Sequence, residues 1–450
     1  MTPFIPGPTY REMLHPELLP EPVRRNAAVA AANELDPANL FNITWRGPEG
    51  TIRHLALPKS LTGVEPNILV LEGRFFPSGS HKVGPAYSTL VEGELAGEIQ
   101  PGASRIIGPS TGNFGIGTAY VSKLKGYPAT VIMPEGMSAE RYARIRQYGG
   151  DLDLTPGSES DVILVLERAH EHYKKDAHNK ILAQFELLPN YRFHRYVTGR
   201  SALEAARAHG NRRVAAFVSA PGSAGTLAAG DEIKSQFPDA IVCALEPKEC
   251  STLFNCGRGT HRIEGIGDKM VTLIHHVLTT DYVALIHDDD CVMGLELLEH
   301  QRTAVERMLG LPEGAWASLA GLFGVSGICN VIGSIRMARF LHLGPGDNVV
   351  TIATDGFDRY PSVLANLKER VGEPLLDQWF QSIFRAWNAA EILDVRPRDQ
   401  KERLFRYKEE VWTPFGYTKP YLEQMKSQSF WDAEFDKIQQ IDPLVTKSRS

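Results

Sequence analysis

The sequence predicts an α/β fold with largely parallel sheets. Strand-like and helix-like runs alternate from about residue 63 to about residue 375. Several strand-like runs are short and continuously apolar, which is typical of strands buried on both faces of a parallel sheet. A chain of 450 residues is also long enough for two or more domains with an ample core.

Nine segments are predicted as strands, because each is a short apolar run. In order, they are residues 67–71, 105–108, 129–133, 152–155, 181–185, 214–219, 241–246, 283–286 and 348–353. The segments between them are predicted as helices, and crossovers between the strands should be right-handed. These helices are residues 83–96, 114–125, 139–147, 159–175, 199–208, 226–236, 292–308, 327–341 and 357–370.

Four parts of the chain differ in character. Residues 1–62 are rich in Pro and Asn and are predicted to be irregular, apart from one helix at 21–35. Two α/β units follow, at residues 63–190 and 191–375. In residues 376–450 the strand signal stops, so a helical extension with aromatic anchors is predicted there. It is either a cap packed on the main body or an interface or lid element.

Composition and charge narrow the class of protein. The hydrophobic content of 43% and the charged content of 23% indicate a globular chain. The net charge of −6 gives no general attraction to nucleic acid or to an anionic membrane, and no secretory signal is visible. The longest apolar runs are far below the ~20 residues that a membrane span needs. Five cysteines, an odd number, favour reduced thiols in a cytoplasm over a disulfide framework, and no metal site is predicted.

Lys82 is the candidate catalytic residue. It ends the segment FPSGSHK (residues 76–82), after the strand predicted at 67–71 and before the helix predicted at 83–96. Ligands of open α/β sheets bind at the carboxyl ends of the strands. A lysine amine at that edge can hold an aldehyde cofactor covalently. Taken alone, Lys82 would be a surface lysine that opens an exposed helix; the order of the other loops favours the catalytic interpretation.

A turn of small residues is the candidate phosphate site. The segment GSAGT (residues 222–226) lies between the strand predicted at 214–219 and the helix predicted at 226–236. Backbone N–H groups of small residues can approach an anion closely at a helix N-terminus. Ser223 and Thr226 can add hydroxyl donors. The turn lacks a Gly-Lys-Ser/Thr ending, which argues against a nucleotide P-loop, and simple packing is the alternative.

A second polar loop, STGNFG (residues 110–115), also follows a predicted strand and opens a predicted helix. Its hydroxyl and N–H groups can hold a substrate carboxylate. Asn113 can donate a hydrogen bond to a ring hydroxyl oxygen. An ordinary helix N-cap is a compatible interpretation, because the same backbone groups can serve both roles.

Seven short segments, spread over roughly residues 50–365, occur in an informative order. Besides 76–82, 110–117 and 220–230, they are Gln184-Phe185 with Asn190 and Thr198-Gly199, HRIEGIG (261–267), GVSG (324–327) and TDGFDRYPS (354–362). In this order they resemble the pyridoxal-phosphate (PLP) enzymes of the cysteine synthase and tryptophan synthase β class. In that family a Pro-x-x-Ser-x-Lys run carries the cofactor lysine. Each similarity is weak alone, whereas seven in order are specific.

The resemblance implies two doubly wound α/β domains with PLP in the cleft between them. The lysine and the substrate loop would lie in residues 63–190, and the phosphate loop in 191–375. Lys82 would form the Schiff base and act as acid and base at Cα, Asn113 would bind the ring oxygen, and Ser326 would face the pyridine nitrogen. The phosphate would be held by Gly222, Ser223, Ala224, Gly225 and Thr226. The substrate carboxylate would be held by Ser110, Thr111, Gly112 and Gln184.

The implied reaction is a β-replacement on a serine- or cysteine-type amino acid through an aminoacrylate, as in cysteine synthase. A β-elimination lyase, such as a desulfhydrase or dehydratase, shares the first half of this reaction and releases a keto acid and ammonia. A non-catalytic protein that keeps the fold is a third alternative. The family also implies a homodimer with a small amino-acid substrate.

Three departures from the family pattern bear on the substrate. Phe114 stands where many relatives have threonine. A single Ser326 replaces a double serine, so its alignment to the pyridine nitrogen can be off by one. Asp268 and Lys269 follow the Gly-Ile-Gly segment, where relatives are usually apolar. The first 62 residues and those after 375 have no recognised counterpart in the short cysteine synthases.

Overall fold

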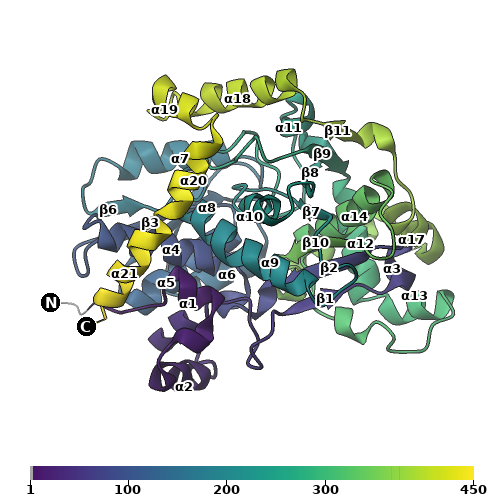
Figure 1. The fold of residues 1–450 in the computed structure, drawn as a ribbon, viewed down its shortest axis with the longest axis horizontal. Helices are drawn as coiled ribbons and strands as arrows, with labels where there is room; N and C mark the ends of the chain where they lie inside the picture. Colours follow the sequence, from purple (N-terminus) through teal and green to yellow (C-terminus); the bar gives the residue numbers. More distant parts are fainter. Residues whose placement is uncertain (1–3, 366, 374, 450) are drawn as a thin grey trace.

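The strands form two separate sheets in this computed structural model, which describes residues 4–365, 367–373 and 375–449 (Figure 1). The larger sheet has the order β1 (His54–Ala56), β2 (Asn67–Glu72), β10 (Asn348–Ala353), β7 (Ala216–Ser219), β8 (Ile241–Pro247), β9 (Tyr282–Ile286) and β11 (Ile392–Asp394). The smaller sheet has the order β5 (Asp151–Thr155), β4 (Ala129–Pro134), β3 (Arg105–Pro109) and β6 (Asn179–Ile181).

Both sheets are largely parallel, as the apolar runs predicted. In the smaller sheet all pairings are parallel, with Ile107 opposite both Thr130 and Ile181. In the larger sheet only the short edge strands β1 and β11 run antiparallel to their neighbours. Successive residues of β10 enter different clusters, Val349 in one and Val350 in the other. Packing on both faces explains why these strands are apolar throughout.

Helices cover the sheets and connect their strands, which confirms the predicted α/β fold. Before β7 they are α1 (Tyr10–Leu14), α2 (Glu21–Ala30), α3 (Lys59–Thr62), α4 (Val83–Leu95), α5 (Asn113–Lys125), α6 (Ala139–Gln147), α7 (Val162–Arg168), α8 (Pro189–Phe193) and α9 (Gly199–Ala206). After β7 they are α10 (Ala228–Gln236), α11 (Thr252–Asn255), α12 (Asp288–Glu299), α13 (Arg302–Met308), α14 (Val325–Phe340), α15 (Pro361–Ala365), α16 (Leu367–Val371) and α17 (Leu376–Phe384).

Some elements differ from the sequence prediction. β2 pairs with β10 in the larger sheet, whereas the sequence analysis grouped residues 67–71 with the strands of residues 63–190. The strand predicted at 181–185 ends at Ile181, because the chain turns away after the Leu182 N–H bonds to Ile107 O. The helix predicted at 292–308 is two helices, α12 and α13. The first begins four residues earlier, with three aspartates in its first turn, where they stabilise the helix dipole.

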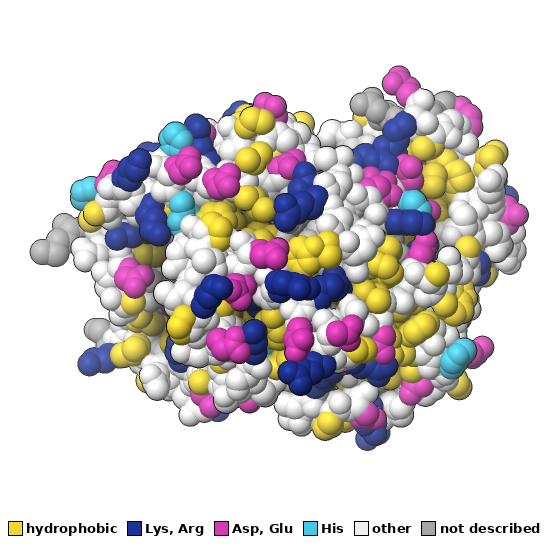
Figure 2. Space-filling view, turned by 90° about the horizontal axis from the view of Figure 1, so that it is seen from above, with side chains coloured by type: hydrophobic (Ala, Val, Ile, Leu, Met, Phe, Trp, Pro, Cys, Tyr) yellow, Lys and Arg dark blue, Asp and Glu magenta, His cyan; other side chains and the backbone are white. Residues whose placement is uncertain are grey.

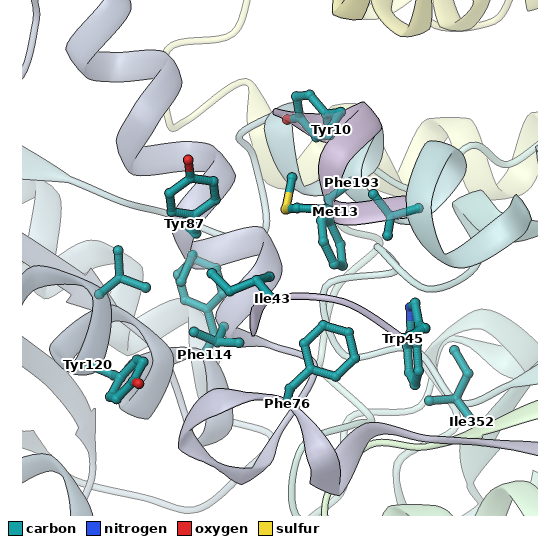
Figure 3. Close-up of a cluster of buried hydrophobic side chains, with 14 of the residues drawn as sticks. Tyr10, Met13, Ile43, Trp45, Phe76, Tyr87, Phe114, Tyr120, Phe193 and Ile352 are labelled. Carbon is teal, nitrogen blue, oxygen red and sulfur yellow. The ribbon is translucent and has the colours of Figure 1, made fainter. Parts of the chain in front are cut away.

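The N-terminal segment is packed into the core, although it is irregular. Its side chains Tyr10, Met13 and Trp45 belong to the same buried cluster as Phe76, which lies in the segment that precedes Lys82 (Figure 3). The Trp45 ring lies edge-on to Phe76, with 4.8 Å between ring centroids. The segment therefore supports the loop that carries the candidate lysine.

The C-terminal extension, predicted at residues 376–450, contains α17 and β11, followed by α18 (Arg398–Trp412), α19 (Lys419–Gln424), α20 (Gln428–Asp436) and α21 (Ile438–Lys447). In Figure 1 it runs across the top of the molecule and then down to the side where the N-terminus lies. There Asp442 accepts a hydrogen bond of 2.8 Å from the Tyr10 N–H. The helical character was predicted; the short strand β11 was not, because three half-buried residues at a sheet edge leave little pattern.

Helix α18 binds residues 271–276, which lie in the connection between β8 and β9. Lys408 donates from Nζ to the carbonyls of Leu273 and His275, at 3.0 and 2.5 Å. Trp412 Nε1 donates to Val271 O at 2.9 Å. The extension is therefore part of the packed body along residues 271–276.

The surface carries both signs of charge. In the view of Figure 2, basic and acidic side chains are interspersed across the face. Among the described residues, no helix has the length and apolar character needed to cross a membrane.

Candidate active site

A narrow pocket, partly open to solvent, lies where strands of both sheets end. It is lined by residues that follow β2, β3, β5, β6, β7 and β10 at or just beyond their carboxyl ends. Of the predicted site residues, it brings together Lys82, Ser110, Thr111, Gly112, Asn113, Gln184, Gly222 and Ser223. The lining also contains Phe114, Glu159, Phe185, Gly265, Asp268 and Thr354, to which the sequence assigned no role. Larger hollows lie elsewhere on the chain, without a buried lysine.

Lys82 is positioned by a tight turn just before α4. Ser78 and Gly79 in this turn both have a positive φ, of 63° and 74°. The buried guanidinium of Arg359 donates to the carbonyl of Ser78 and, at 3.0 Å, to that of Gly79. Arg359 also forms an ion pair with Asp358 at 3.2 Å. These hydrogen bonds from Arg359 to the turn before Lys82 could not be predicted from the sequence, because the bonded residues Gly79 and Arg359 are 280 positions apart.

The Lys82 amine is buried and lacks an acceptor. The residue is 8% exposed, and the hydrogen bonds of the described residues include none from its Nζ. Burial lowers the pKa of Lys82 to about 8, and the carboxylates of Asp268 and Glu159 oppose this shift. An amine with this pKa is neutral in an appreciable fraction near pH 7, which is the form that attacks an aldehyde.

The loop before α5 presents polar groups to the pocket. Ser110 Oγ accepts hydrogen bonds from the N–H groups of Gly112 and Gly115, at 3.1 and 2.9 Å. These bonds fix the loop and leave the Ser110 hydroxyl proton free to donate. The Thr111 hydroxyl donates to the buried carboxylate of Glu159. With helix α5 beginning at Asn113, the loop is suited to hold a carboxylate.

Two amide side chains in the pocket have unpaired oxygens. Asn113 donates from Nδ2 to Asp355 at 2.5 Å, but its Oδ1 has no partner among the described residues. The Oε1 of Gln184 also lacks a described partner. Buried polar atoms are normally paired, so unpaired ones in a pocket indicate a ligand site.

Arg141 links the two α/β units behind the substrate loop. It is fully buried on α6, and it donates to Thr111 O at 3.3 Å and to the Tyr360 hydroxyl at 3.1 Å. Its guanidinium also lies 3.0 Å from Glu264 and 3.5 Å from Glu159. These carboxylates keep Arg141 charged despite its burial, and its pKa is raised. The sequence placed residues 139–147 on a helix without indicating this role.

The turn at residues 222–226 is held closely by its neighbours. A Cβ on Gly222 would lie 2.6 Å from Gly265 O, so only glycine fits there. Asn190 donates to Ser223 Oγ at 3.0 Å. Thr226 Oγ1 lies 2.9 Å from Ser219 Oγ. Only Gly222 and Ser223 of this turn line the pocket; the other three are not among its lining residues.

Ser326 is buried in the first turn of α14 and is not among the residues that line the pocket. The start of α14 nevertheless approaches the pocket wall. A Cβ on Gly324 would lie 2.1 Å from Asp355 Oδ1, and Asp355 accepts the hydrogen bond from Asn113. The assignment of Ser326 to the pyridine nitrogen stays a prediction.

The donor set fits an aldehyde cofactor with a phosphate. A buried amine without an acceptor is available for the aldehyde, and unpaired amide groups are available for polar ring substituents. On the other side, the small-residue turn reaches the pocket at Gly222 and Ser223, and backbone N–H groups of such a turn can bind a phosphate. These are the groups that PLP requires.

Comparison with known proteins identifies the family. Residues 52–355 match the family described as pyridoxal-phosphate dependent enzyme. A cysteine synthase of Staphylococcus aureus (strain Mu50 / ATCC 700699) is 32% identical over 288 residues, which are 64% of this chain and 84% of the relative. A probable cysteine synthase of Bacillus subtilis (strain 168) is 31% identical over 289 residues, covering 64% and 86%.

Solved structures share the fold. An O-acetyl serine sulfhydrylase (isoform 3) from Entamoeba histolytica has a TM-score of 0.61 and 25% identity, covering 74% of this chain and 93% of that one. A hydrogen sulfide-producing enzyme from Fusobacterium nucleatum has a TM-score of 0.58 and 24% identity, covering 68% and 96%. The chain, with its lysine pocket between two parallel sheets, therefore belongs to the family of pyridoxal-phosphate dependent enzymes.

Proposed function

We propose that this PLP-dependent enzyme catalyses a β-replacement on a serine- or cysteine-type amino acid. The observation that carries the proposal is the Lys82 amine, which is buried without an acceptor in the same pocket as the loop Ser110–Asn113 and the turn at Gly222. The similarity to cysteine synthases supports the β-replacement. The same similarity predicts a homodimer in the cytoplasm.

When bound, PLP supplies an electron sink for chemistry at the Cα of an amino acid. In the proposal Lys82 holds the cofactor and then takes and returns the proton at Cα. Asn113 binds the ring oxygen, and Ser326 faces the pyridine nitrogen. The phosphate-binding residues are Gly222, Ser223, Ala224, Gly225 and Thr226.

The substrate carboxylate is assigned to the loop at Ser110, Thr111 and Gly112, together with Gln184. Arg141 serves as a positioning residue, because it holds the carbonyl of Thr111 from behind. Phe114 and Phe185 line the pocket with apolar surface and limit the access of water to it.

A β-elimination that releases a keto acid and ammonia is the second candidate. The observation that favours it is Asp268, a carboxyl group in the pocket that can bind and polarise water. Elimination and replacement share the removal of the Cα proton, so Lys82 has the same role in both.

The test incubates the holoenzyme with O-acetyl-L-serine or L-cysteine, with and without sulfide. A β-replacement predicts a new amino acid whose yield depends on the added nucleophile. Keto acid formation that no nucleophile changes would assign the chain to elimination instead. Lys82→Ala is the control, and it should form neither product.

A further inference from the structure

Asp268 is a pocket residue that neither binding of the cofactor nor binding of the carboxylate uses. It lines the same pocket as Lys82 and is 6% exposed. Its Oδ2 has no hydrogen-bond partner among the described residues. The main chain is fixed next to it, because the N–H of Gly267 donates to Pro221 O at 3.0 Å, at the start of the phosphate turn.

Lys269, the residue after Asp268, is an example of a charged side chain in this region that has a structural partner. Lys269 forms an ion pair with Asp161 at 2.5 Å, with both side chains partly exposed. Asp268 forms no such pair within the described residues, although it is more deeply buried. A buried carboxyl without a partner destabilises the fold, so its presence in a pocket indicates a function.

The charged and titratable groups that face Asp268 are Lys82, Glu159 and Cys250. Burial raises the pKa of Asp268 to about 7, and the charge of Lys82 opposes this shift. Burial also raises the pKa of Glu159, to about 8, although Arg141 and the Thr111 hydroxyl oppose this shift. Unlike Asp268, Glu159 contacts these two groups, through the hydrogen bond from Thr111 and the ion pair with Arg141. Of the two pocket carboxyls, Asp268 is therefore the one that holds no other side chain in place, which leaves it available for proton transfer.

We propose that Asp268 is a catalytic acid and base for the substituent on the β carbon of the bound amino acid. The enzyme then acts on substrates whose β substituent leaves as hydroxide or hydrosulfide. Both are more basic than acetate, and hydroxide, the strongest base of the three, needs a proton most. This inference rests on the proposed function, in either its replacement or its elimination form.

The proton transfer balances as follows. The Cβ–O or Cβ–S bond breaks, and its electron pair stays on the oxygen or sulfur. Protonated Asp268 gives its proton to that atom, so that water or a thiol leaves as a neutral molecule and Asp268 remains a carboxylate. In replacement, this carboxylate takes the proton of the incoming thiol as its sulfur bonds to Cβ. An acetate leaving group is a weak base and needs no such proton.

The test compares leaving groups within one variant. The holoenzyme and Asp268→Asn are assayed for kcat/KM with L-serine, L-cysteine and O-acetyl-L-serine. Loss of a general acid should lower the value for serine roughly 10²–10⁴-fold, the value for cysteine less, and the value for O-acetyl-L-serine by less than about tenfold. Because all three substrates use the same cofactor and the same lysine, the ratio between them does not depend on how much variant is folded.

Glu159→Gln is the matched control. It also replaces a pocket carboxyl by an amide, but Glu159 holds Thr111 and Arg141. It should therefore weaken the reaction similarly for all three substrates. A result in which Glu159→Gln discriminates between leaving groups and Asp268→Asn does not would overturn the assignment.

A second readout does not depend on turnover. Carbon-13 labelling of aspartate carboxyls, followed by NMR in both the holoenzyme and the protein without cofactor, should show a carboxyl that titrates near pH 7. The signal should be missing in Asp268→Asn and present in Glu159→Gln. Its absence from the wild-type protein would count against the proposal.

The outcomes separate this inference from the proposed function. Equal losses on all three substrates would reduce Asp268 to a positioning residue, and no loss would remove it from the mechanism. A wild-type enzyme that acts only on O-acetyl-L-serine would contradict the substrate class alone. A wild-type enzyme that retains its lysine-bound cofactor but acts on none of the three would overturn the proposed function, and this inference with it.

Discussion

Two buried lysines, Lys82 in the pocket and Lys408 in the C-terminal extension, have opposite surroundings. Lys408 is 1% exposed and donates to two backbone carbonyls, those of Leu273 and His275. Lys82 is nearly as buried but has no acceptor among the described residues. Burial lowers the pKa of both, to about 7 for Lys408 and about 8 for Lys82.

The difference separates a structural lysine from an available one. The acceptors around Lys408 complete the packing of α18 on residues 271–276. Around Lys82, by contrast, the oxygens Asn113 Oδ1, Gln184 Oε1 and Asp268 Oδ2 are also unpaired within the described chain. Burial alone therefore does not identify a functional lysine; burial without a partner, in a pocket with other unpaired groups, does.

Replacement of Lys82 is expected to have the largest effect. Lys82→Ala removes the only amine in the lining of the pocket as described, so covalent capture of PLP should be lost. We expect turnover to fall at least about 10³-fold. The visible absorbance of bound cofactor and its resistance to dialysis measure the capture directly.

Lys408→Ala is the comparison variant. It should keep the covalent link and a substantial part of the activity in the fraction that is folded. Retention of a borohydride-reducible link in Lys82→Ala, or its complete loss in folded Lys408→Ala, would break the distinction between the two lysines.

The pH dependence of cofactor capture is the next largest effect. With a pKa of about 8 in place of its ordinary value near 10.5, the Lys82 amine has an about 300-fold larger neutral fraction at pH 7. The rate at which the protein without cofactor captures PLP should rise as pH increases to about 8 and then level off. Stopped-flow absorbance measures this rate.

Asp268→Asn sharpens this test. The Asp268 carboxylate raises the pKa of Lys82, so its removal should move the midpoint of the profile to lower pH. A rate that keeps rising to pH 10, as for an exposed lysine, would contradict the environment described for Lys82.

Much of the fold was predictable, because continuous apolar runs report burial on both faces of a strand. The runs at 67–71, 105–108 and 348–353 all became strands close to their predicted limits. Sheet membership was not predictable, because the residues of β2 that pair with β10 are 281 positions away in the sequence, as in Asn67 and Asn348. The strand β11 at Ile392–Asp394 was missed because it is short, half-buried and at an edge.

The site was predictable only where a local motif carries it. The loops at Lys82, Ser110 and Gly222 have characteristic local sequences, and the structure brings them together. Arg141 and Arg359 act through contacts that no local pattern encodes. Asp268 was recognised in the sequence as a charged residue where relatives are usually apolar. That its side chain lines the pocket could be seen only in the folded structure.

At high pH, replacement of Lys408 should destabilise the fold, whereas replacement of Lys82 should not. At pH 10, Lys408→Met leaves two buried carbonyls without a donor and should lower the free energy of unfolding by about 2 kcal/mol. Lys82→Met removes no hydrogen bond from Nζ and should not lower it. Urea unfolding at fixed temperature measures both.

At pH 7 the free energy of unfolding of both variants, relative to that of the wild type, should be higher than at pH 10. Each folded lysine has a pKa below its unfolded value, so the unfolded chain binds more protons between the two values, and wild-type stability rises with pH in that window. For Lys408 this pH window runs from about 7 up to the ordinary pKa of lysine. For Lys82 it runs from about 8 up to the same ordinary pKa. Identical responses of the two variants at pH 10 would mean that the carbonyls contribute nothing.

The smallest expected effect comes from relief of backbone strain, which is a further difference between the pocket and the region around Lys408. Ser78 and Ala224 have a positive φ, of 63° and 65°, in the two turns that flank the pocket, whereas residues 271–276 contain no positive-φ residue. Ala224→Gly should relieve roughly 1 kcal/mol of strain, partly offset by the greater freedom of glycine in the unfolded chain, for a net gain of about 0.5 kcal/mol.

Cys256→Gly is the matched control for Ala224→Gly, because Cys256 also has a positive φ, of 68°, but ends α11 outside the pocket lining. Both variants should raise the midpoint of urea unfolding, while only Ala224→Gly should weaken retention of the cofactor, since a more flexible turn loses more freedom when it binds phosphate. A lower midpoint for Ala224→Gly would mean that contacts of its methyl group outweigh the strain. In that case the pocket would differ from the Lys408 region in its unpaired polar groups alone.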